Sequence, residues 1–118
     1  MDKVLVVDDD AVVAELIALM FEEEGVHALI AGDGLEALTI AHEERPQLVL
    51  TDVTMPGMDG VELCRQLRRD PGTSAMVVLL MSAAVDTDPS GCGADGVIRK
   101  PFDIEDLVET VHRHLTVA

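Results

Sequence analysis

The chain has 118 residues, enough for one domain with a hydrophobic core that needs no disulfide or metal to hold it together. Lysine and arginine number 8 against 23 aspartates and glutamates, and this formal net charge of −15 argues against direct binding to nucleic acid. No apolar stretch approaches the length of a membrane span and no signal-peptide pattern is visible, so we expect a cytoplasmic protein without membrane contact.

The first half of the chain alternates short apolar runs with longer amphipathic stretches. Short apolar runs rich in Val and Leu are typical of strands buried on both faces, and they predict strands at 4–7 and 48–51. The run at 26–31, which includes a histidine, predicts a weaker strand. The amphipathic stretches predict helices at 11–24, 35–44 and 61–69. Asp10 is a plausible cap for the first helix and Gly25 a plausible stop, while Pro46 bars extension of the second.

The second half continues the alternation, with one irregular interruption. The run Met-Val-Val-Leu-Leu-Met predicts a buried strand at 76–81, and a short strand follows at 97–99. Between them lies an irregular stretch, 83–95, which contains Pro89, Gly91 and Gly93. An apolar stripe at helical spacing predicts the last helix at 104–115. Strands that alternate with helices over short connections predict one α/β domain, residues 1–118, with a parallel sheet covered on both faces.

Polar side chains follow four of the five predicted strands. Asp8 and Asp9 follow the first strand, Asp52 the third, Ser82 the fourth and Lys100 the fifth. Because right-handed crossovers place the carboxyl ends of all parallel strands along one edge, we expect these five side chains to converge there. Any one of them alone is an ordinary solvated loop residue, but turn chemistry would accept Gly, Asn or Pro equally well at each place.

This set of residues suits phosphoryl chemistry. Three carboxylates at one edge repel each other unless a cation intervenes, and all-oxygen ligands favour a partly hydrated Mg²⁺. Asp52 is already ionised at neutral pH, so it needs no base to attack phosphorus and form an aspartyl phosphate. Lys100 could then pair with a phosphoryl oxygen, and Ser82 could donate a hydrogen bond to another. No general acid or base is apparent, which favours a protein that modifies itself over a turnover enzyme.

These residues resemble the receiver domain of two-component response regulators over essentially the whole chain. The resemblance rests on Val6-Val7-Asp8-Asp9, on the run from Asp52 through Met55-Pro56 to Asp59-Gly60, on Ser82-Ala83 and on Lys100-Pro101-Phe102. It implies a flavodoxin-like, doubly wound sheet of five parallel strands in the order 2-1-3-4-5, with a cis peptide bond before Pro101.

The resemblance also implies roles for the residues at the sheet edge. Asp52 would accept a phosphoryl group from a histidine kinase or histidine phosphotransfer protein. Asp9, Asp52 and the carbonyl of Thr54 would hold Mg²⁺, with Asp8 assisting through water. Ser82 would be the switch hydroxyl and Lys100 the phosphate-binding lysine. The phosphorylated domain would relay the signal by a conformational change.

Two departures from the family pattern concern the switch. Val97 occupies the place of the family's aromatic switch residue in the fifth strand. The segment from Ser82 to Lys100 is also short by about one turn of helix, and its proline and glycines break what remains, so we expect the fourth helix to be shortened or irregular. In the family, that surface is the common output and dimerisation face. The sequence therefore leaves open whether the chain forms a homodimer.

The first helix carries more apolar surface than its own packing requires. Val13, Leu16, Ile17 and Met20 are predicted to form its core stripe, yet few polar residues occupy the other faces. We therefore hypothesise that the kinase or phosphotransfer protein docks on an apolar patch around Val12 and Leu19. The alternative is that a larger intact protein, or a dimer, covers this face.

Three other functions share part of this set of residues. A phosphatase of the haloacid-dehalogenase type would need a second aspartate where this chain has Thr54, and a flavodoxin-like cofactor binder would need more stacking aromatics than Phe21 and Phe102. A degenerate receiver that binds partners without phosphorylation is opposed by the intact set of acids.

The four histidines share no metal-ligand spacing and are predicted to lie at the surface. Cys64 is predicted to be a reduced core residue, whereas the glycines around Cys92 leave an exposed position open.

Overall fold

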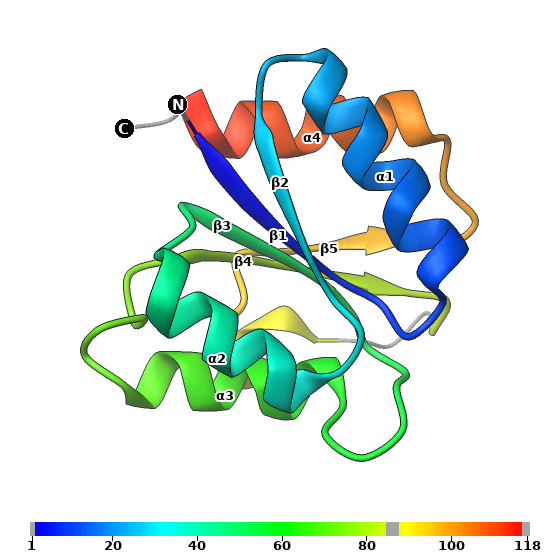
Figure 1. Cartoon of the computed structure of the whole chain (residues 1–118). Helices are drawn as coiled ribbons and strands as arrows, with labels where there is room; N and C mark the ends of the chain where they lie inside the picture. Colours follow the sequence, from blue (N-terminus) through cyan, green and yellow to red (C-terminus); the bar gives the residue numbers. More distant parts are fainter. Residues whose placement is uncertain (1, 85–87, 117–118) are drawn as a thin grey trace.

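A computed structural model describes residues 2–84 and 88–116 of the chain (Figure 1). Strands and helices alternate through the first half: β1 (Lys3–Val7), α1 (Ala11–Glu23), β2 (His27–Ala31), α2 (Gly34–Glu44), β3 (Leu48–Asp52) and α3 (Gly60–Arg69). The second half contains β4 (Val77–Ser82), a single turn of 3₁₀ helix η1 (Pro89–Gly91), β5 (Gly96–Arg99) and α4 (Ile104–Thr116). Every predicted strand and helix is present, and no end differs from its prediction by more than one residue.

The five strands form one parallel sheet in the order β2-β1-β3-β4-β5, which confirms the predicted topology. Helices α1 and α4 cover one face of the sheet, and α2 and α3 cover the other (Figure 1). The strand register pairs Val7 with Thr51 and Thr51 with Leu80, so the carboxyl ends of β1, β3 and β4 are level with one another. The residues that follow these strands therefore meet at one edge.

Each face of the sheet has its own hydrophobic core. Along β1, Val4 and Val6 pack against α1 and α4, whereas Leu5 and Val7 pack against α2 and α3. Successive strand residues point to opposite faces, so a strand covered on both sides must be apolar at every position. This is why the central strands appear in the sequence as unbroken runs of Val and Leu.

Helix α1 is rotated relative to the predicted stripe. Ala14 and Ala18 are buried together with Ile17, while Leu16, predicted to lie in the core, is 47% exposed. The small alanine side chains allow the helix to lie close to the sheet, and Phe21 fills the space at its end. The rotation leaves Leu16 outside the core, beside the edge where the strands end.

The segment between β4 and β5 is held against α3 by Arg68. The guanidinium of Arg68 donates to the carbonyl oxygens of Gly93 at 2.8 Å and Met76 at 2.6 Å, and it pairs with the Asp95 carboxylate at 2.9 Å. Asp95 also accepts the Val78 amide at 2.8 Å. Among the described residues of this segment the only helical turn is η1, as expected of a shortened fourth helix. Arg68 thus anchors the segment where a full helix would pack through its own apolar face.

Both cysteines lie in the core on the α3 side. The Cys64 thiol donates to the Cys92 carbonyl at 3.3 Å, and burial, followed by its hydrogen bond with Cys92, raises the pKa of Cys64 to about 12. The sequence left open that Cys92 is exposed, and this is wrong. Its side chain is buried in the same hydrophobic cluster as Leu63 and Leu67. A thiol with such a high pKa is unreactive at neutral pH.

Two further findings bear on the sequence predictions. The peptide bond between Lys100 and Pro101 is cis, as the resemblance implies. None of the helices in the described part of the chain combines the length and the apolar composition that crossing a bilayer requires.

The imidazole of His42 connects α2 to the end of α3. Its Nδ1 lies 2.8 Å from the Leu38 carbonyl oxygen and its Nε2 lies 2.5 Å from the Asp70 carboxylate. Both partners are acceptors, so the ring donates both hydrogen bonds only when it is protonated. The Asp70 carboxylate, followed by the Leu38 carbonyl, raises the pKa of His42, and His42 in turn lowers the pKa of Asp70.

We predict that His42→Gln destabilises the fold in a pH-dependent manner. The contribution of His42 is fully present below its unfolded-state pKa, about 6.5, and it is lost as the pH rises through the raised folded-state pKa. The contribution of Asp70 is present above its ordinary pKa and is lost as the pH falls. Urea denaturation should therefore show the largest deficit of the variant at mildly acidic pH and a smaller one at alkaline pH. An equal deficit at both would contradict the prediction.

Candidate functional site

Three carboxylates meet at the carboxyl edge of the sheet. Asp8 and Asp9 follow β1, Asp52 is the last residue of β3, and oxygen atoms of the three side chains lie within 4.8 Å of one another. Asp8 is 3% exposed and Asp52 7%, whereas Asp9 is exposed to solvent. The structure therefore brings together the acidic residues that the sequence predicted to converge.

Hydrogen bonds with the backbone hold Asp8 and the N-cap residue Asp10 in place. The Asp8 amide donates to the Ala31 carbonyl at 3.1 Å, which extends the pairing of β1 with β2 by one residue. The Asp8 carboxylate accepts the Asp10 amide at 2.9 Å. Asp10 is the N-cap of α1, and its carboxylate accepts the amides of Val12 and Val13 at 3.1 and 3.3 Å. The end of β1, Asp8 and the start of α1 are thus joined by hydrogen bonds through Asp10.

Lys100 contacts Asp52 directly. Its Nζ donates to Oδ1 of Asp52 at 2.9 Å, and its backbone amide donates to the Ser82 carbonyl at 2.9 Å. The Val53 amide donates to the Met81 carbonyl at 3.0 Å, which ties the end of β3 to β4. The ends of β3, β4 and β5 are therefore linked across the edge, with the lysine side chain facing the central carboxylate.

Ser82 and Thr54 flank this group. Asp52 is registered with Met81, so Ser82 lies one residue beyond the strand neighbour of Asp52, and its side chain is buried. The Ser82 hydroxyl oxygen accepts the Ala84 amide at 3.0 Å. Thr54 lies in the loop two residues after Asp52 and is exposed. Ser82 is thus close to Asp52 in the sheet, and Thr54 is close to it along the chain.

The charges at this edge fit a divalent cation. Burial is the largest cause that raises the pKa of Asp8, and the charges of Asp52 and Asp9 raise it further, against the opposing effects of the Asp10 amide and Lys100. A set of carboxylate oxygens is the donor set that hard ions prefer. The formal charges are −3 from the acids and +1 from Lys100, so a divalent ion would bring the sum to zero.

A cavity of about 700 Å³ opens beside the acids and has an apolar wall. Val13 and Leu16 of α1 line it together with Phe102 and Ile104, which follow Lys100 at the start of α4. From the sequence, Val13 and Leu16 were predicted to lie in the core, and Phe102 and Ile104 were not predicted to line the site. The excess of apolar residues on the first helix was the one signal of this wall available in the sequence.

Helix α3 begins against the backbone of Asp52. Asp59 caps the helix by accepting the Glu62 amide at 2.8 Å, and the Gly60 amide donates to the Val53 carbonyl at 2.9 Å. A Cβ atom on Gly60 would overlap the Asp52 carbonyl oxygen and would lie 3.0 Å from Cα of Val53. Glycine at position 60 therefore allows the helix to approach the strand end that carries Asp52.

The sheet order and the acids at its edge define a CheY-like α/β domain. The chain matches the family model described as "Response regulator receiver domain" over residues 4–112. It therefore belongs to the response regulator receiver domain family, the phospho-acceptor domains of two-component signalling.

Similarity to individual proteins agrees with this assignment. The chain is 41% identical over 114 residues to the DNA-binding response regulator MtrA of Mycobacterium tuberculosis, and the match covers 96% of this chain and 50% of that protein. It is 31% identical over 115 residues to the DNA-binding dual master transcriptional regulator RpaA of Synechocystis, covering 94% of this chain and 48% of that protein. The chain thus spans about half the length of these curated relatives.

Solved structures show the same fold along the whole chain. The chemotaxis protein CheY4 of Vibrio cholerae superimposes with a TM-score of 0.89 at 30% identity, covering 96% of this chain and 98% of that one. A putative response regulator from Chloroflexus aurantiacus gives a TM-score of 0.88 at 32% identity, with 97% of each chain covered.

We predict that Gly60→Ala destabilises the domain by about 2 kcal/mol, because the added methyl group forces α3 away from the Asp52 backbone. Urea denaturation of the variant and the wild type gives the difference. Gly32→Ala is the matched control, since a Cβ there meets nothing within 4 Å. Equal stability of the two variants would show that α3 does not need this close approach.

Proposed function

We propose that Asp52 is the phospho-acceptor of this receiver domain and that Asp8, Asp9, Thr54, Ser82 and Lys100 assist its phosphorylation. One observation carries the proposal: the Asp52 carboxylate lies at the sheet edge with Lys100 at 2.9 Å and two further carboxylates within 4.8 Å. The phosphoryl group comes from a phosphohistidine on a histidine kinase or a histidine phosphotransfer protein, the donor class that family membership implies.

In the transfer step, an Asp52 oxygen attacks phosphorus as the bond from phosphorus to the donor's imidazole nitrogen breaks. The electron pair of that bond stays on the imidazole nitrogen, which takes a proton from solvent, and Asp52 becomes an acyl phosphate. Lys100 is already directed at Asp52, so its ammonium group can shift to a phosphoryl oxygen without leaving the site. The Ser82 hydroxyl, one residue beyond the strand neighbour of Asp52, would donate to another phosphoryl oxygen.

Mg²⁺ would be held by the carboxylates of Asp9 and Asp52 and the carbonyl oxygen of Thr54, with Asp8 assisting through water. When bound, this ion supplies positive charge that offsets the charge of the phosphoryl oxygens in the transition state. Its affinity for the site rests on the acids themselves, because their mutual repulsion in the folded domain is relieved by a cation.

The signal would leave the site through the segment that joins β4 to β5. Ser82 and Lys100 bound this segment and are joined by the hydrogen bond between the Lys100 amide and the Ser82 carbonyl. A phosphoryl group that draws the Ser82 hydroxyl and the Lys100 ammonium toward Asp52 pulls on both ends of the segment. Val97 packs against the core on the α3 side, so we infer that backbone movement, rather than an aromatic side chain, carries the change.

We infer that the domain is a signalling phospho-acceptor and not a turnover enzyme. A haloacid-dehalogenase phosphatase would need an acid at position 54, where this chain has an exposed threonine. The domain would instead catalyse reactions of its own Asp52, because the same residues would promote both the phosphorylation and the dephosphorylation of that side chain. A degenerate, unphosphorylated receiver is disfavoured because the acids and Lys100 lie within reach of one another.

We infer further that residues 1–118 form one receiver domain and that the phosphodonor docks on α1. Val12 is 74% exposed, Leu19 56% and Leu16 47%, which makes an apolar stripe that continues into the wall of the cavity beside Asp52. A docked helix would bring its phosphohistidine to the acids while covering this stripe. DNA contact by this acidic domain itself stays unexpected, although the curated relatives include proteins named for DNA binding.

We predict that incubation with Mg²⁺ and a small phosphodonor such as acetyl phosphate adds one phosphoryl group to the wild type and none to Asp52→Asn. The asparagine variant lacks the anionic nucleophile but keeps its shape. Intact mass spectrometry measures the adduct, and chelation of Mg²⁺ should abolish it. An adduct on the variant would place the acceptor elsewhere, and no adduct on the wild type would favour the degenerate receiver.

We also predict that Val12→Glu slows phosphotransfer from the protein donor at least tenfold and leaves labelling by the small donor unchanged. A carboxylate in the stripe disrupts apolar docking but lies on the solvent side of α1. Leu35→Glu, an equally exposed apolar position on α2, is the matched control. Docking on α1 would be excluded by equal slowing of both labelling reactions.

A further inference from the structure

Helix α2 begins against the loop that joins β3 to α3, and Figure 1 shows α2 and α3 side by side on one face of the sheet. Gly34, the first residue of α2, is buried, and a Cβ atom placed on it would lie 2.8 Å from Cβ and 2.9 Å from both Cγ and Sδ of Met58. These distances are shorter than van der Waals contact. The Met58 side chain therefore occupies the space that any other residue at position 34 would need for its own side chain.

The loop, residues 53–59, is fixed at several points. At its start the Val53 amide donates to the Met81 carbonyl at 3.0 Å, and the Val53 carbonyl accepts the Gly60 amide at 2.9 Å. Met55 is 7% exposed and lies in the core on the α3 side, and the half-buried Met58 packs against the same core. The two residues between these methionines are exposed. The middle of the loop is thus held to the domain through its methionines.

The contact between Gly34 and Met58 connects two parts of the candidate metal site. Ala31, the last residue of β2, accepts the Asp8 amide at 3.1 Å, and two residues separate it from Gly34. On the other side of the contact, the loop carries Thr54, whose carbonyl oxygen is a proposed ligand of Mg²⁺. The contact therefore joins the turn that bonds Asp8 to the loop that carries Thr54.

We propose that Gly34 and Met58 are positioning residues, and that their contact holds the loop where Thr54 can bind Mg²⁺. The inference rests on the function proposed above and adds two residues that act through the loop rather than on the ion. Thr54 belongs to no strand or helix, so its position depends on the contacts that fix the loop. Residues that orient a metal ligand set the affinity for the metal, because a displaced ligand must return to its place before the ion is bound.

Rotation of the Met58 side chain does not relieve a clash at position 34. Its Cβ atom is bonded to the backbone and lies nearest, at 2.8 Å, so side-chain torsions move Cγ and Sδ but leave this atom in place. A methyl group on residue 34 therefore has to displace the backbone of the loop or the first turn of α2. Alanine favours helix formation more than glycine does, so helix propensity does not account for a loss of function in Gly34→Ala.

The first test is the affinity of Gly34→Ala for Mg²⁺. We expect the dissociation constant to rise about tenfold, as for other residues that orient a metal ligand. Mg²⁺ is titrated into the ¹⁵N-labelled chain, and the constant is taken from the amide shifts of the residues around Asp9 and Asp52. Gly32→Ala adds the same methyl group where nothing lies within 4 Å, and it should bind Mg²⁺ like the wild type.

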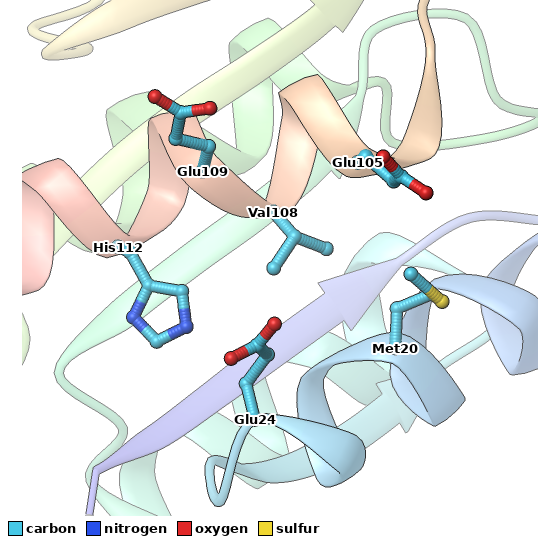
Figure 2. A pocket seen from close by; sticks show the side chains of 6 residues that line it. All are labelled: Met20, Glu24, Glu105, Val108, Glu109 and His112. Carbon is cyan, nitrogen blue, oxygen red and sulfur yellow. The ribbon is translucent and has the colours of Figure 1, made fainter.

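Met20→Ala separates positioning from a general loss of stability. Met20 is also a half-buried methionine, but it lines a cleft of about 390 Å³ between α1 and α4, on the opposite face of the sheet (Figure 2). We expect this variant to have a lower melting temperature and an unchanged dissociation constant for Mg²⁺. Weakening of Mg²⁺ binding equal to that of Gly34→Ala would overturn the inference, because destabilisation alone would then explain both.

Met58→Ala tests whether the two residues act through one contact. It removes Cγ and Sδ, two of the three atoms that a methyl group on residue 34 would meet. We expect Met58→Ala to weaken Mg²⁺ binding, and Gly34→Ala to have a smaller effect in this background than in the wild type. Effects that simply multiply in the double variant would overturn the inference. Should Gly34→Ala not fold, an unchanged constant for Met58→Ala, which creates no clash, would do the same.

The outcomes are distinct from those of the proposed function. A dissociation constant of Gly34→Ala equal to that of the wild type, or no Mg²⁺-dependent shifts in the wild type, would overturn the inference. Labelling of Asp52 by acetyl phosphate at saturating Mg²⁺ is measured on the same samples. If the wild type is labelled while the two constants are equal, the positioning role is wrong and the phospho-acceptor function stands. If Gly34→Ala binds Mg²⁺ more weakly but Asp52 is not labelled in the wild type, the function alone is rejected.

Discussion

The contact between Lys100 and Asp52 is the interaction on which the edge of the sheet depends. Three carboxylates within 4.8 Å of one another, two of them buried, repel each other, and Lys100 at 2.9 Å supplies the compensating charge. The lysine can reach Asp52 because the carboxyl ends of the strands are level and because its own backbone is bonded to Ser82. The parallel register of the sheet thus concentrates negative charge and also delivers the cation that makes this tolerable.

Much of this arrangement could be predicted from the sequence because its signals are local. Strands buried on both faces must be apolar at every position, so the run at Val4–Val7 was recognisable, and the residue after each strand is placed by topology alone. The rotation of α1 was not predictable from the helix itself, because both the Leu16 and the Ala18 faces are apolar. The close approach of the helix to the sheet decides between them. The anchoring of Gly93 by Arg68 depends on residues 25 positions apart, and no local pattern announces it.

The chain has the fold of its family, with an irregular segment between β4 and β5. Family membership and the likeness to CheY4 establish a receiver domain, and in the described part of the segment before β5 the helical structure is the single turn η1. This turn occurs where Arg68 replaces helix packing by hydrogen bonds to carbonyl groups. The core, the sheet order and the acids keep the family arrangement around this local change.

Helix α3 touches both regions. Its first residue, Gly60, lies against the carbonyl group of Asp52. Arg68, near its other end, donates hydrogen bonds to Gly93 and Asp95. A helix of this length is stiff, so a displacement of its first turn, which lies against the strand that carries Asp52, would also displace its last turn. We expect that a shift of the Asp52 backbone would move α3 and, through Arg68, the residues that precede β5. Mechanical transmission of this kind requires no side chain to swing.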